Sequence, residues 1–449
     1  MIKRILISFS IMLVALFPAQ LAFAKNSGLA FIRDAEIEHT LRSYASPLFI
    51  AAGLNANDVS IHLINNKVIN AFVAGGQRMF FFTGLLERVE SPGQLKGIIA
   101  HETGHIAGSH LSRTQDALAN ATAKSILGYI LGAAAVFAGG GKAGAAVVGG
   151  AEGIAQKSFL KYSRQQESSA DQASMRYLEA THSSGKGMLE FLQILGKAEQ
   201  IYVGKVDPYW RSHPISQDRV SSLKYRVEAS KFRDVPDSPL EIEALKRVQA
   251  KLYGFTKTLG KTLRKYPHSD QSASARYARA IAYFKYPKID KAEIEIESLL
   301  TEFPENPFFH ELKGQMLFEN GDPISAVEPM RLAATYLPKE PLILTLYGTV
   351  LLATGYAEDD AEAINVLKDS VFYGPYRAGT WNQLAIAYSR AGDTGNLALA
   401  TAERFLLLKQ GKKAVFHAKR VQQLMKPGTP GFLRADDIIT LATRLRKKN

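Results

Sequence analysis

Small residues and prolines recur at equal intervals in the C-terminal part of the 449-residue chain. The residues that keep a 34-residue step are Ala280, Gly314 and Gly348; Pro304 and Pro338; Pro307, Pro341 and Pro375; and Gly321 and Gly355. A period of this length is typical of a repeated helix–turn–helix unit. Small residues at matching positions let two helices pack closely. The spacing therefore predicts an all-helical array in which each unit contacts its neighbours.

The period is that of the tetratricopeptide repeat (TPR), and one segment matches its consensus clearly. That segment reads Trp381-x-x-Leu384-Ala385-x-x-Tyr388, with a turn at Gly392-Asp393. The step from Gly348 to Ala385 is 37, so one repeat carries three extra residues, expected near 357–361. We predict about four repeats and a capping segment to Leu445, enough to bury a continuous core. The alternative is a plain helical bundle.

A second motif reads His101-Glu102-Thr103-Gly104-His105 and lies in a predicted helix, with Ser91 as N-cap and Pro92 as first residue. Histidines four residues apart share one helix face, where two imidazoles can hold a Zn²⁺. Glu102 is turned about 100° from His101, so it can take a proton from a water beside the metal. This His-Glu-x-x-His arrangement is typical of zinc peptidases. The alternative is a surface helix with two ordinary histidines.

The apolar residues at 95–100 favour a buried helix, in which unpaired polar side chains are costly. A catalytic zinc site needs a third protein ligand, and Glu167 is the best candidate in the chain. Asp171, one helical turn later, could accept the other N–H of a ligating histidine and hold its tautomer. We place His110 outside the ligand set, because five residues turn a continuing helix about 140° away from His105.

Residues 1–24 read as a secretory signal. Lys3 and Arg4 precede a thirteen-residue apolar core, and an Ala-x-Ala cleavage site ends at Ala24. The apolar core is shorter than a membrane span, which disfavours the alternative of a retained anchor. The chain has no cysteine, which excludes lipid attachment at the cut and disulfides elsewhere. We therefore predict a periplasmic protein stabilised by its core, its metal and its repeats.

The net charge is +13, and +11 once the two basic residues of the signal are removed. The excess is spread along the chain. It could favour anionic headgroups at a membrane, or it could serve only solubility. We find no nucleic-acid motif, and export argues against a nucleic-acid partner.

Before the zinc helix, residues 29–56 read as helical, and apolar runs at 59–63, 68–73 and 79–82 read as strands. An edge strand beside a peptidase cleft can bind an extended substrate as an added strand. The alternative for the region 70–82 is a core hairpin.

After the zinc helix, residues 125–151 form uncharged Gly- and Ala-rich runs interrupted by Lys142. Each run is shorter than the usual span of about 20 residues. We predict a mobile hairpin that covers the cleft or lies on a membrane surface; the alternative is a spanning pair.

Together these motifs resemble the peptidase family of the CaaX prenyl protease and the heat-shock protease HtpX. The resemblance covers roughly residues 30–230 and rests on His101-Glu102-x-x-His105, Glu167-x-x-x-Asp171, Ser212-His213-Pro214 with Arg219, and Asn70-Ala71-Phe72. It implies a zinc endopeptidase with one Zn²⁺ per chain, ligands His101, His105 and Glu167, and the base Glu102. It also implies that Arg219 lies near the site and that Asn70, Ala71 and Phe72 form a substrate strand. In secreted members, the histidine that matches His213 can occupy the open zinc position and keep the enzyme quiet.

The predicted fold is an α+β zincin-type peptidase domain, mostly helical with a small sheet, followed by an all-α TPR solenoid. The predicted divisions are a signal at 1–24, a peptidase domain at 25–230, a helical linker at 231–266 and repeats at 267–449. This architecture resembles an envelope branch of the family. The resemblance implies a periplasmic endopeptidase for quality control and assembly of outer-membrane proteins, whose repeats dock clients or the β-barrel assembly machinery. The second hypothesis is a chaperone-like assembly factor with a largely autoinhibited site.

Overall fold

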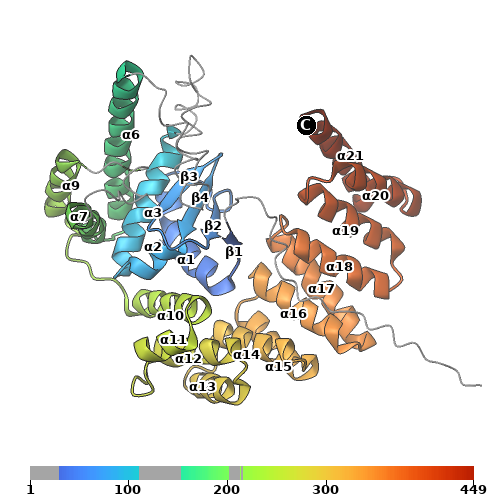
Figure 1. Cartoon of the computed structure of the whole chain (residues 1–449). Helices are drawn as coiled ribbons and strands as arrows, with labels where there is room; N and C mark the ends of the chain where they lie inside the picture. The colour runs from blue at the N-terminus through green and yellow to red at the C-terminus, as the bar shows by residue number, and fades with distance from the viewer. Residues whose placement is uncertain (1–29, 111–152, 202–212, 214–215, 449) are drawn as a thin grey trace, which may run out of the picture.

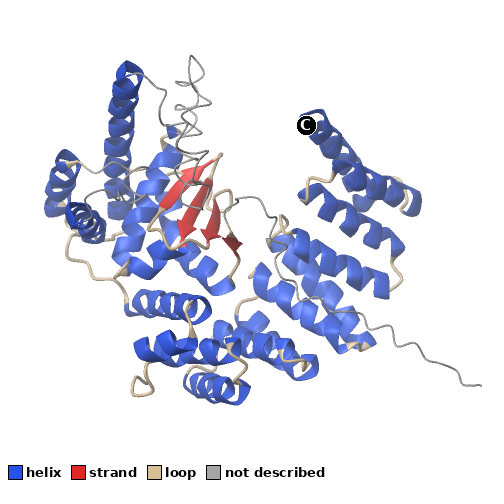
Figure 2. Ribbon diagram, in the orientation of Figure 1, coloured by secondary structure: helices blue, strands red, loops and turns tan. Residues whose placement is uncertain are grey.

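The computed structural model describes residues 30–110, 153–201, 213 and 216–448. Along the chain, a small sheet covered by helices is followed by a curved array of helices (Figure 1). The described strands all lie in the first part (Figure 2). The predicted signal at 1–24 and the predicted hairpin at 125–151 lie outside the described residues.

One four-stranded sheet has the order β1-β2-β4-β3, with bounds β1 (Phe31–Ile32), β2 (Ser60–Ile64), β3 (Ala71–Ala74) and β4 (Arg78–Phe82). β2 and β4 are parallel, whereas β1 pairs with β2 and β3 pairs with β4 in antiparallel fashion. The three predicted strand runs correspond to β2, β3 and β4. Gly75 and Gly76 turn the chain between β3 and β4 with φ of 53° and 95°, values that glycine adopts readily. The strand order places β3 at one edge of the sheet in the described residues.

The first part also contains these helices among the described residues: α1 (Ala35–Ala51), α2 (Thr83–Arg88), α3 (Pro92–Ala107), α6 (Gly153–Ala180), α7 (Lys186–Ile201) and α9 (Gln217–Ala229). The central one is α3, which packs against α1, α6, α7 and β3. Its apolar residues Leu95, Ile98 and Ile99 are buried, as predicted. Burial of each such side chain contributes about 1.5–3 kcal/mol, so packing holds α3 firmly between sheet and helices.

The second part consists of antiparallel helix pairs. α10 (Pro239–Thr256) and α11 (Leu259–Lys265) lie in the predicted linker segment. Five pairs follow: α12 (Ala273–Lys285) with α13 (Ile289–Glu302), α14 (Pro307–Glu319) with α15 (Pro323–Tyr336), α16 (Pro341–Thr354) with α17 (Ala357–Tyr373), α18 (Ala378–Arg390) with α19 (Thr394–Leu407), and α20 (Gly411–Leu424) with α21 (Pro430–Lys448). The predicted fold class, a small mixed sheet with helices followed by a TPR-like solenoid, is confirmed. The domain boundaries themselves stay a prediction.

The spaced glycines of the array lie where two helices touch. A Cβ on Gly314 would lie 2.6 Å from Met330 Cγ, and a Cβ on Gly348 would lie 2.5 Å from Leu367 Cγ. Side chains at these positions would push the paired helices apart. The 34-residue interval between small residues therefore reflects helix contact, as the sequence predicted.

The predicted period is wrong at Pro375. Pro307 and Pro341 are the first residues of α14 and α16, whereas α18 begins three residues after Pro375. The extra residues lengthen α17, which has 17 residues where α15 has 14. Pro375 therefore corresponds to Pro304 and Pro338, which also precede a helix start by three residues.

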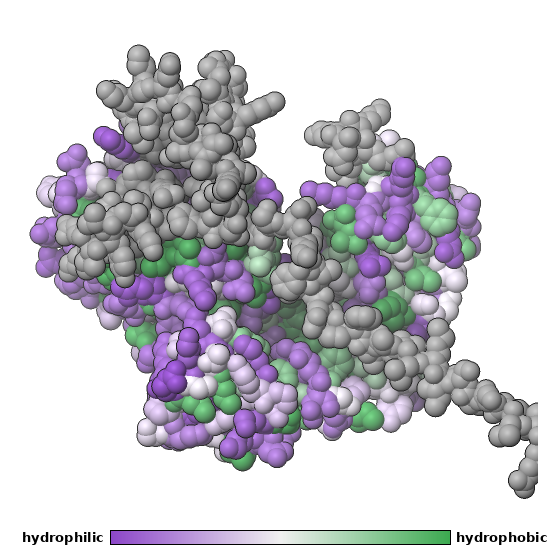
Figure 3. All heavy atoms as spheres, in the orientation of Figure 1, coloured by the Kyte–Doolittle hydropathy of each residue, from purple (hydrophilic) through white to green (hydrophobic). Residues whose placement is uncertain are grey.

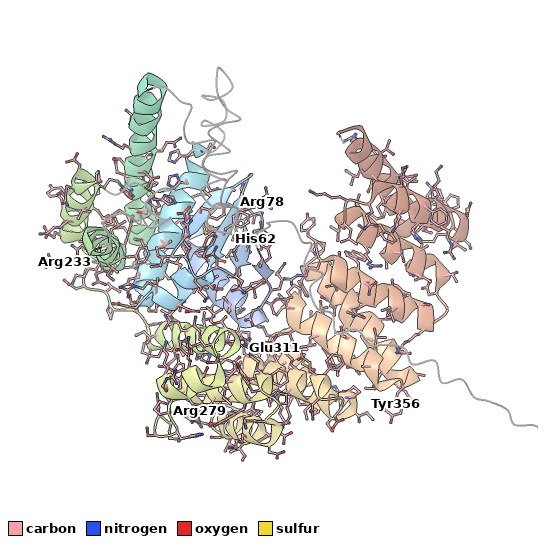
Figure 4. The ribbon with its side chains drawn as sticks, viewed as in Figure 1. His62, Arg78, Arg233, Arg279, Glu311 and Tyr356 are labelled. Carbon is pink, nitrogen blue, oxygen red and sulfur yellow. The ribbon has the colours of Figure 1, made fainter. Side chains whose placement is uncertain are left out.

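A group of buried charges joins the two parts where α1 meets the array. Lys251 Nζ on α10 lies 3.0 Å from Asp34 Oδ2, 3.7 Å from Glu36 Oε2 and 3.6 Å from Glu311 Oε2. Tyr277 donates a hydrogen bond to Glu36 at 2.8 Å. Figure 4 labels Glu311 at this meeting point. We call the following residues the junction cluster: Asp34, Glu36, Arg247, Lys251, Tyr277 and Glu311.

The visible surface of the array is mostly hydrophilic, with hydrophobic side chains scattered across it (Figure 3). Over the described ranges, none of the helices combines the length and the apolar character needed to cross a membrane.

Candidate metal centre

Helix α3 begins where its sequence predicts. The Ser91 side chain accepts a hydrogen bond from the Gln94 N–H at 3.2 Å, and Pro92 is the first helical residue. Both features are confirmed. The helix continues to Ala107, so His101 and His105 lie one turn apart in its second half.

Two glycines let neighbouring helices approach α3 closely. A Cβ on Gly104 would lie 3.0 Å from Ala170 O of α6, and a Cβ on Gly97 would lie 2.5 Å from Met188 Cβ of α7. The approach at Gly104 brings α6, which carries Glu167, against the histidine face. Sequence reasoning assigned no role to these glycines, although small residues in a bulky apolar helix were an available signal.

His101, His105, Glu167 and His213 converge inside the first part, and all four are buried. One candidate ligand atom from each lies within 4.8 Å of the others. The Nε2 atoms of His101 and His105 are 3.1 Å apart, and Glu167 oxygens lie 3.3 Å from each. His213 Nδ1 lies 3.3 Å from His101 Nε2 and 3.2 Å from the Glu167 carboxylate. Ligands of a tetrahedral zinc are separated by about 3.3 Å, so this spacing fits the metal.

The other ring nitrogen of each α3 histidine faces away from the cluster. His101 Nδ1 lies 3.0 Å from Asp171 Oδ1, and His105 Nδ1 lies 3.0 Å from His110 Nδ1. Outer contacts of this kind orient the ring and leave Nε2 toward the metal. The contact of His110 was not predicted, because the spacing argument assumed that the helix continues. Instead α3 ends at Ala107, and the chain turns back toward His105.

Arg219 lies on α9 and contacts two carboxylates of α6. Its Nε and Nη2 donate hydrogen bonds to Asp171 at 2.7 and 2.8 Å, and its Nη1 lies 2.9 Å from Glu167 Oε2. A guanidinium paired in this two-pronged way restricts both distance and angle. Arg219 therefore fixes the positions of Asp171 and Glu167 together.

These contacts keep both carboxylates ionised. Burial alone would raise the pKa of Asp171, but hydrogen bonds from Arg219 and His101 outweigh it and lower the pKa to about 2. Burial would likewise raise the pKa of Glu167, yet neighbouring imidazoles, His213 first, hold it well below its usual value. Ionised carboxylates are the forms that a ligand and an orienting group require.

The pKa values of the two α3 histidines shift in opposite directions. Burial lowers the pKa of His105 to about 4, which favours the neutral imidazole that binds metals. Burial also acts to lower the pKa of His101, but Asp171 and Glu167 outweigh it and raise the pKa to about 10. The rise shows that negative charge dominates around His101. A cation in the cluster would take over the role of that proton.

The charges of the site fit a divalent cation. Three buried carboxylates, Glu102, Glu167 and Asp171, are set against the one guanidinium of Arg219. Both Glu102 oxygens are buried, and Oε1 lies 3.2 Å from His213 Nε2. Buried carboxylates are costly without positive partners, and a cation held by the clustered imidazoles would supply one. Histidine nitrogens with a carboxylate oxygen suit zinc.

Glu102 and His213 face each other across the cluster. His213 Nε2 lies 3.2 Å from Glu102 Oε1, while its Nδ1 faces Glu167. Burial raises the pKa of the Glu102 carboxyl, the direction that strengthens it as a base. The imidazole of His213 thus occupies the space between the candidate base and the candidate third ligand. The neighbours of His213 in the quoted motif, Ser212 and Pro214, lie outside the described residues.

The predicted substrate strand lies at the edge of the sheet. The Asn70 carbonyl accepts a hydrogen bond from the Phe82 N–H at 3.0 Å, and Ala71 and Phe72 pair with β4. β3 is the last strand of this sheet in the described residues, and it packs against α3. An extended chain can add to such an edge through main-chain hydrogen bonds. The structure therefore leaves this edge beside the metal centre, and the substrate role stays a prediction.

Comparison with known proteins gives one matching family. The family model of Peptidase family M48 matches residues 32–227. This span contains strands β2, β3 and β4, helix α3 and the four clustered residues.

Curated relatives extend further along the chain. The chain is 26% identical over 422 residues to the Beta-barrel assembly-enhancing protease of Yersinia pestis, covering 91% of this chain and 84% of that protein. It is 25% identical over 201 residues to Metalloprotease LoiP of Escherichia coli, covering 41% of this chain and 71% of that protein. Among solved structures, yeast Tom70 aligns with a TM-score of 0.29 and 14% identity over 82% of this chain and 86% of that one.

Proposed function

We propose that one zinc ion serves the reaction of this chain, whose residues 32–227 belong to peptidase family M48 and which is a metallopeptidase. In this proposal, His101, His105 and Glu167 hold the zinc ion. The convergence of these three buried side chains, with ligand atoms at the spacing of a zinc site, carries the proposal. When bound, zinc supplies a Lewis acid that polarises the scissile carbonyl and makes a water more acidic.

The remaining steps belong to residues of the chain. Glu102 takes the proton of the attacking water and later delivers it to the leaving amine. Its burial favours this exchange, because a raised pKa suits a group that must both accept and return a proton. Asp171 orients the His101 ring through its contact with His101 Nδ1. Arg219 fixes the positions of Asp171 and Glu167 relative to each other.

The substrate in this proposal is a polypeptide in extended form. It pairs with the outer edge of β3 at the segment Asn70-Ala71-Phe72, where Ala71 presents its main-chain groups to that edge because the groups of its two neighbours are directed to β4. Main-chain pairing places a peptide bond beside α3 and is tolerant of side-chain sequence. Such tolerance suits an enzyme that meets many unfolded chains.

The cellular setting is carried over from a relative. A relative that aligns over 91% of this chain is named a beta-barrel assembly-enhancing protease. Together with the signal pattern at 1–24, this supports a periplasmic enzyme for quality control and assembly of outer-membrane proteins. The TPR-like array then docks clients or the assembly machinery, because such arrays present extended concave surfaces to other proteins.

Metal analysis and cleavage of casein test the proposal together. The mature protein should contain one zinc per chain, and a chelator should stop cleavage. Glu102→Gln should keep the metal and the fold while losing about 10²- to 10⁴-fold in rate, since it removes the base and no ligand. Wild-type turnover in that variant would end the role of Glu102.

A second function has support from the position of His213. Its imidazole lies among the metal ligands and 3.2 Å from Glu102, where it would exclude the attacking water. The protein could then act mainly as a chaperone-like assembly factor whose peptidase site is closed. In cells that lack the protein, full rescue of outer-membrane assembly by Glu102→Gln would favour this alternative, and absence of rescue would favour the enzyme.

His213→Ala separates two roles of this histidine. As an autoinhibitory ligand, its loss should raise basal cleavage while the metal stays bound. As a donor to the oxyanion of the tetrahedral intermediate, its loss should lower the rate by about 10²–10³. An unchanged rate would remove His213 from the site.

A further inference from the structure

A cavity of about 630 Å³ lies between helices α10 and α11 and the loop from β2 to β3. Its lining residues are Lys67, Tyr253, Lys257, Lys261, Arg264 and Lys265. Five of these six side chains are cationic, and none belongs to the metal centre. We call this cavity the cationic cavity.

Most of this charge has no acidic partner. Lys257 Nζ donates to the two carboxylate oxygens of Glu87 at 2.9 and 2.7 Å. Lys265 Nζ lies 4.4 Å from the centre of the Tyr253 ring, a cation–π contact that holds it at the cavity. In the described part of the chain, no ion pair links an acid to Lys67, Lys261, Arg264 or Lys265.

Lys265 responds to both signs of charge around the cavity. Burial lowers the pKa of Lys265, the nearby Glu87 carboxylate acts to raise it, and the weaker repulsion of Lys257 acts to lower it. Like charges that converge on one space are destabilising when acids do not match them in number, and an anionic occupant relieves the repulsion. The cavity is therefore complementary to a ligand with several negative charges.

The cavity approaches the proposed substrate strand through Lys67. Lys67 stands three residues before Asn70, in the loop that leads into β3. This loop is held against α2, because a Cβ on Gly84 would lie 2.2 Å from Lys67 O and the Gly84 N–H donates to Asn66 O at 2.8 Å. Three extended residues span about 10 Å, so a chain paired with β3 reaches the cavity within a few residues.

We propose that the cationic cavity is an exosite that binds acidic side chains of a polypeptide substrate whose neighbouring segment pairs with β3. The inference rests on the proposed peptidase function and adds a substrate feature to it. A polypeptide is favoured as the occupant because the cavity approaches the substrate strand through Lys67 and the enzyme acts on polypeptides. Carboxylates spaced along one flexible chain can meet several of the separated cations together.

Binding at this distance from the reacting atoms has a defined kinetic signature. It acts equally on bound substrate and transition state, so it should lower KM and leave kcat unchanged. Exposed charges are screened within about 8–10 Å at physiological salt, so the effect should shrink as salt rises.

The experiment uses the full-length, zinc-loaded protein and three peptides with one cleavable core. One peptide has an Asp/Glu block before the core, one has it after the core, and one has a Ser/Gly block. Fluorescence anisotropy with the Glu102→Gln variant measures binding without cleavage, and the wild-type protein supplies KM and kcat. One of the two acidic peptides should bind about 5- to 20-fold more tightly than the neutral one at low salt. The preferred side reveals the direction in which substrate runs along β3.

Charge removal tests the location. Lys261→Gln combined with Arg264→Gln removes two exposed cations of the cavity and should reduce the acidic preference about 3- to 10-fold. Lys368→Gln combined with Arg420→Gln removes an equal number of positive charges from exposed positions on α17 and α20. This control should leave the preference for acidic peptides unchanged. Equal losses in both double variants would overturn the exosite, since overall charge would then explain the effect.

Other outcomes also decide the matter. Equal binding of acidic and neutral peptides, with normal cleavage of both, overturns the exosite and leaves the peptidase function standing. Absence of binding and cleavage for all three peptides overturns both. Tripolyphosphate that binds in a manner dependent on Lys261 and Arg264, while acidic peptides gain nothing, would assign the cavity to a phosphate ligand and overturn the proposal.

Discussion

The metal centre and the junction cluster are both buried groups of charge, yet only one of them gathers several imidazole nitrogens around a single point. In the junction cluster, Lys251 and Arg247 face Asp34, Glu36 and Glu311. Burial raises the pKa of Glu311 to about 7, so a proton can neutralise the excess carboxyl. In the metal centre, Arg219 pairs with Asp171 and Glu167, and neighbouring carboxylates raise the pKa of His101 to about 10.

The difference shows how a buried polar cluster reveals its role. The junction cluster consists of ion pairs between carboxylates and the long side chains of Lys251 and Arg247, which join two parts of the chain. In the metal centre, one ligand atom from each of His101, His105, Glu167 and His213 lies within 4.8 Å of the others, a spacing that fits zinc coordination. Burial of charge by itself would not have separated the two.

The largest expected effect is loss of the metal. His105→Ala should abolish zinc binding, because it removes an Nε2 that lies inside the cluster. His110→Ala is the matched control, since it removes only the outer contact of His105 Nδ1 and should retain zinc. Elemental analysis of the purified proteins measures both. Full zinc content in His105→Ala would contradict the ligand assignment.

The next effect concerns the junction cluster. Lys251→Met should lower the free energy of unfolding by about 3–5 kcal/mol, because it leaves buried carboxylates without their cation. Zinc content should not change, since Lys251 is remote from the metal ligands. Urea unfolding measures the loss. Lys246→Met, on the exposed side of the same helix, is the control and should change stability by less than about 0.5 kcal/mol.

A smaller loss is expected when an outer contact of the metal centre is removed. Asp171→Ala should cost about 10- to 100-fold in zinc affinity or activity, because His101 Nδ1 and Arg219 lose their shared partner. Competition with a zinc chelator measures the affinity. Glu167→Ala should be more damaging. The reverse order would exchange the roles of these two carboxylates.

The smallest effect is a dependence of stability on pH. The folded protein binds a proton at Glu311 more tightly than the unfolded chain does, since the pKa is raised from 4.5 to about 7. Stability from this group is therefore full below about pH 4.5 and falls, by about 1–3 kcal/mol, as pH rises through 7. Glu311→Gln should flatten that part of the profile in urea unfolding at pH 5 and pH 8. Part of the pH dependence of stability should remain in this variant, because burial also raises the pKa of Glu340 to about 7.

Prediction of the array succeeded where contacts are local. Each pair of helices packs on its neighbours, so the interval between Gly314 and Gly348 carried the helix contacts directly. The prediction failed at Pro375, because α17 is three residues longer than α15 and the start of α18 is displaced by the same number. A sequence interval alone does not show the length of a helix. The junction cluster was not predicted at all, since Asp34 and Lys251 are far apart in sequence and meet only where α10 packs beside α1.

In the metal centre, the sequence by itself determined which side chains share a helix face. His101 with His105, and Glu167 with Asp171, follow from four-residue spacing on α3 and α6, because helix geometry is local. Only the tertiary structure decided which atoms of these pairs meet. The contact of His110 with His105, the fork of Arg219 and the position of His213 depend on where α3 ends and how α6 and α9 pack against it. Such convergence arises from burial of apolar faces on distant segments, and no spacing within one segment encodes it.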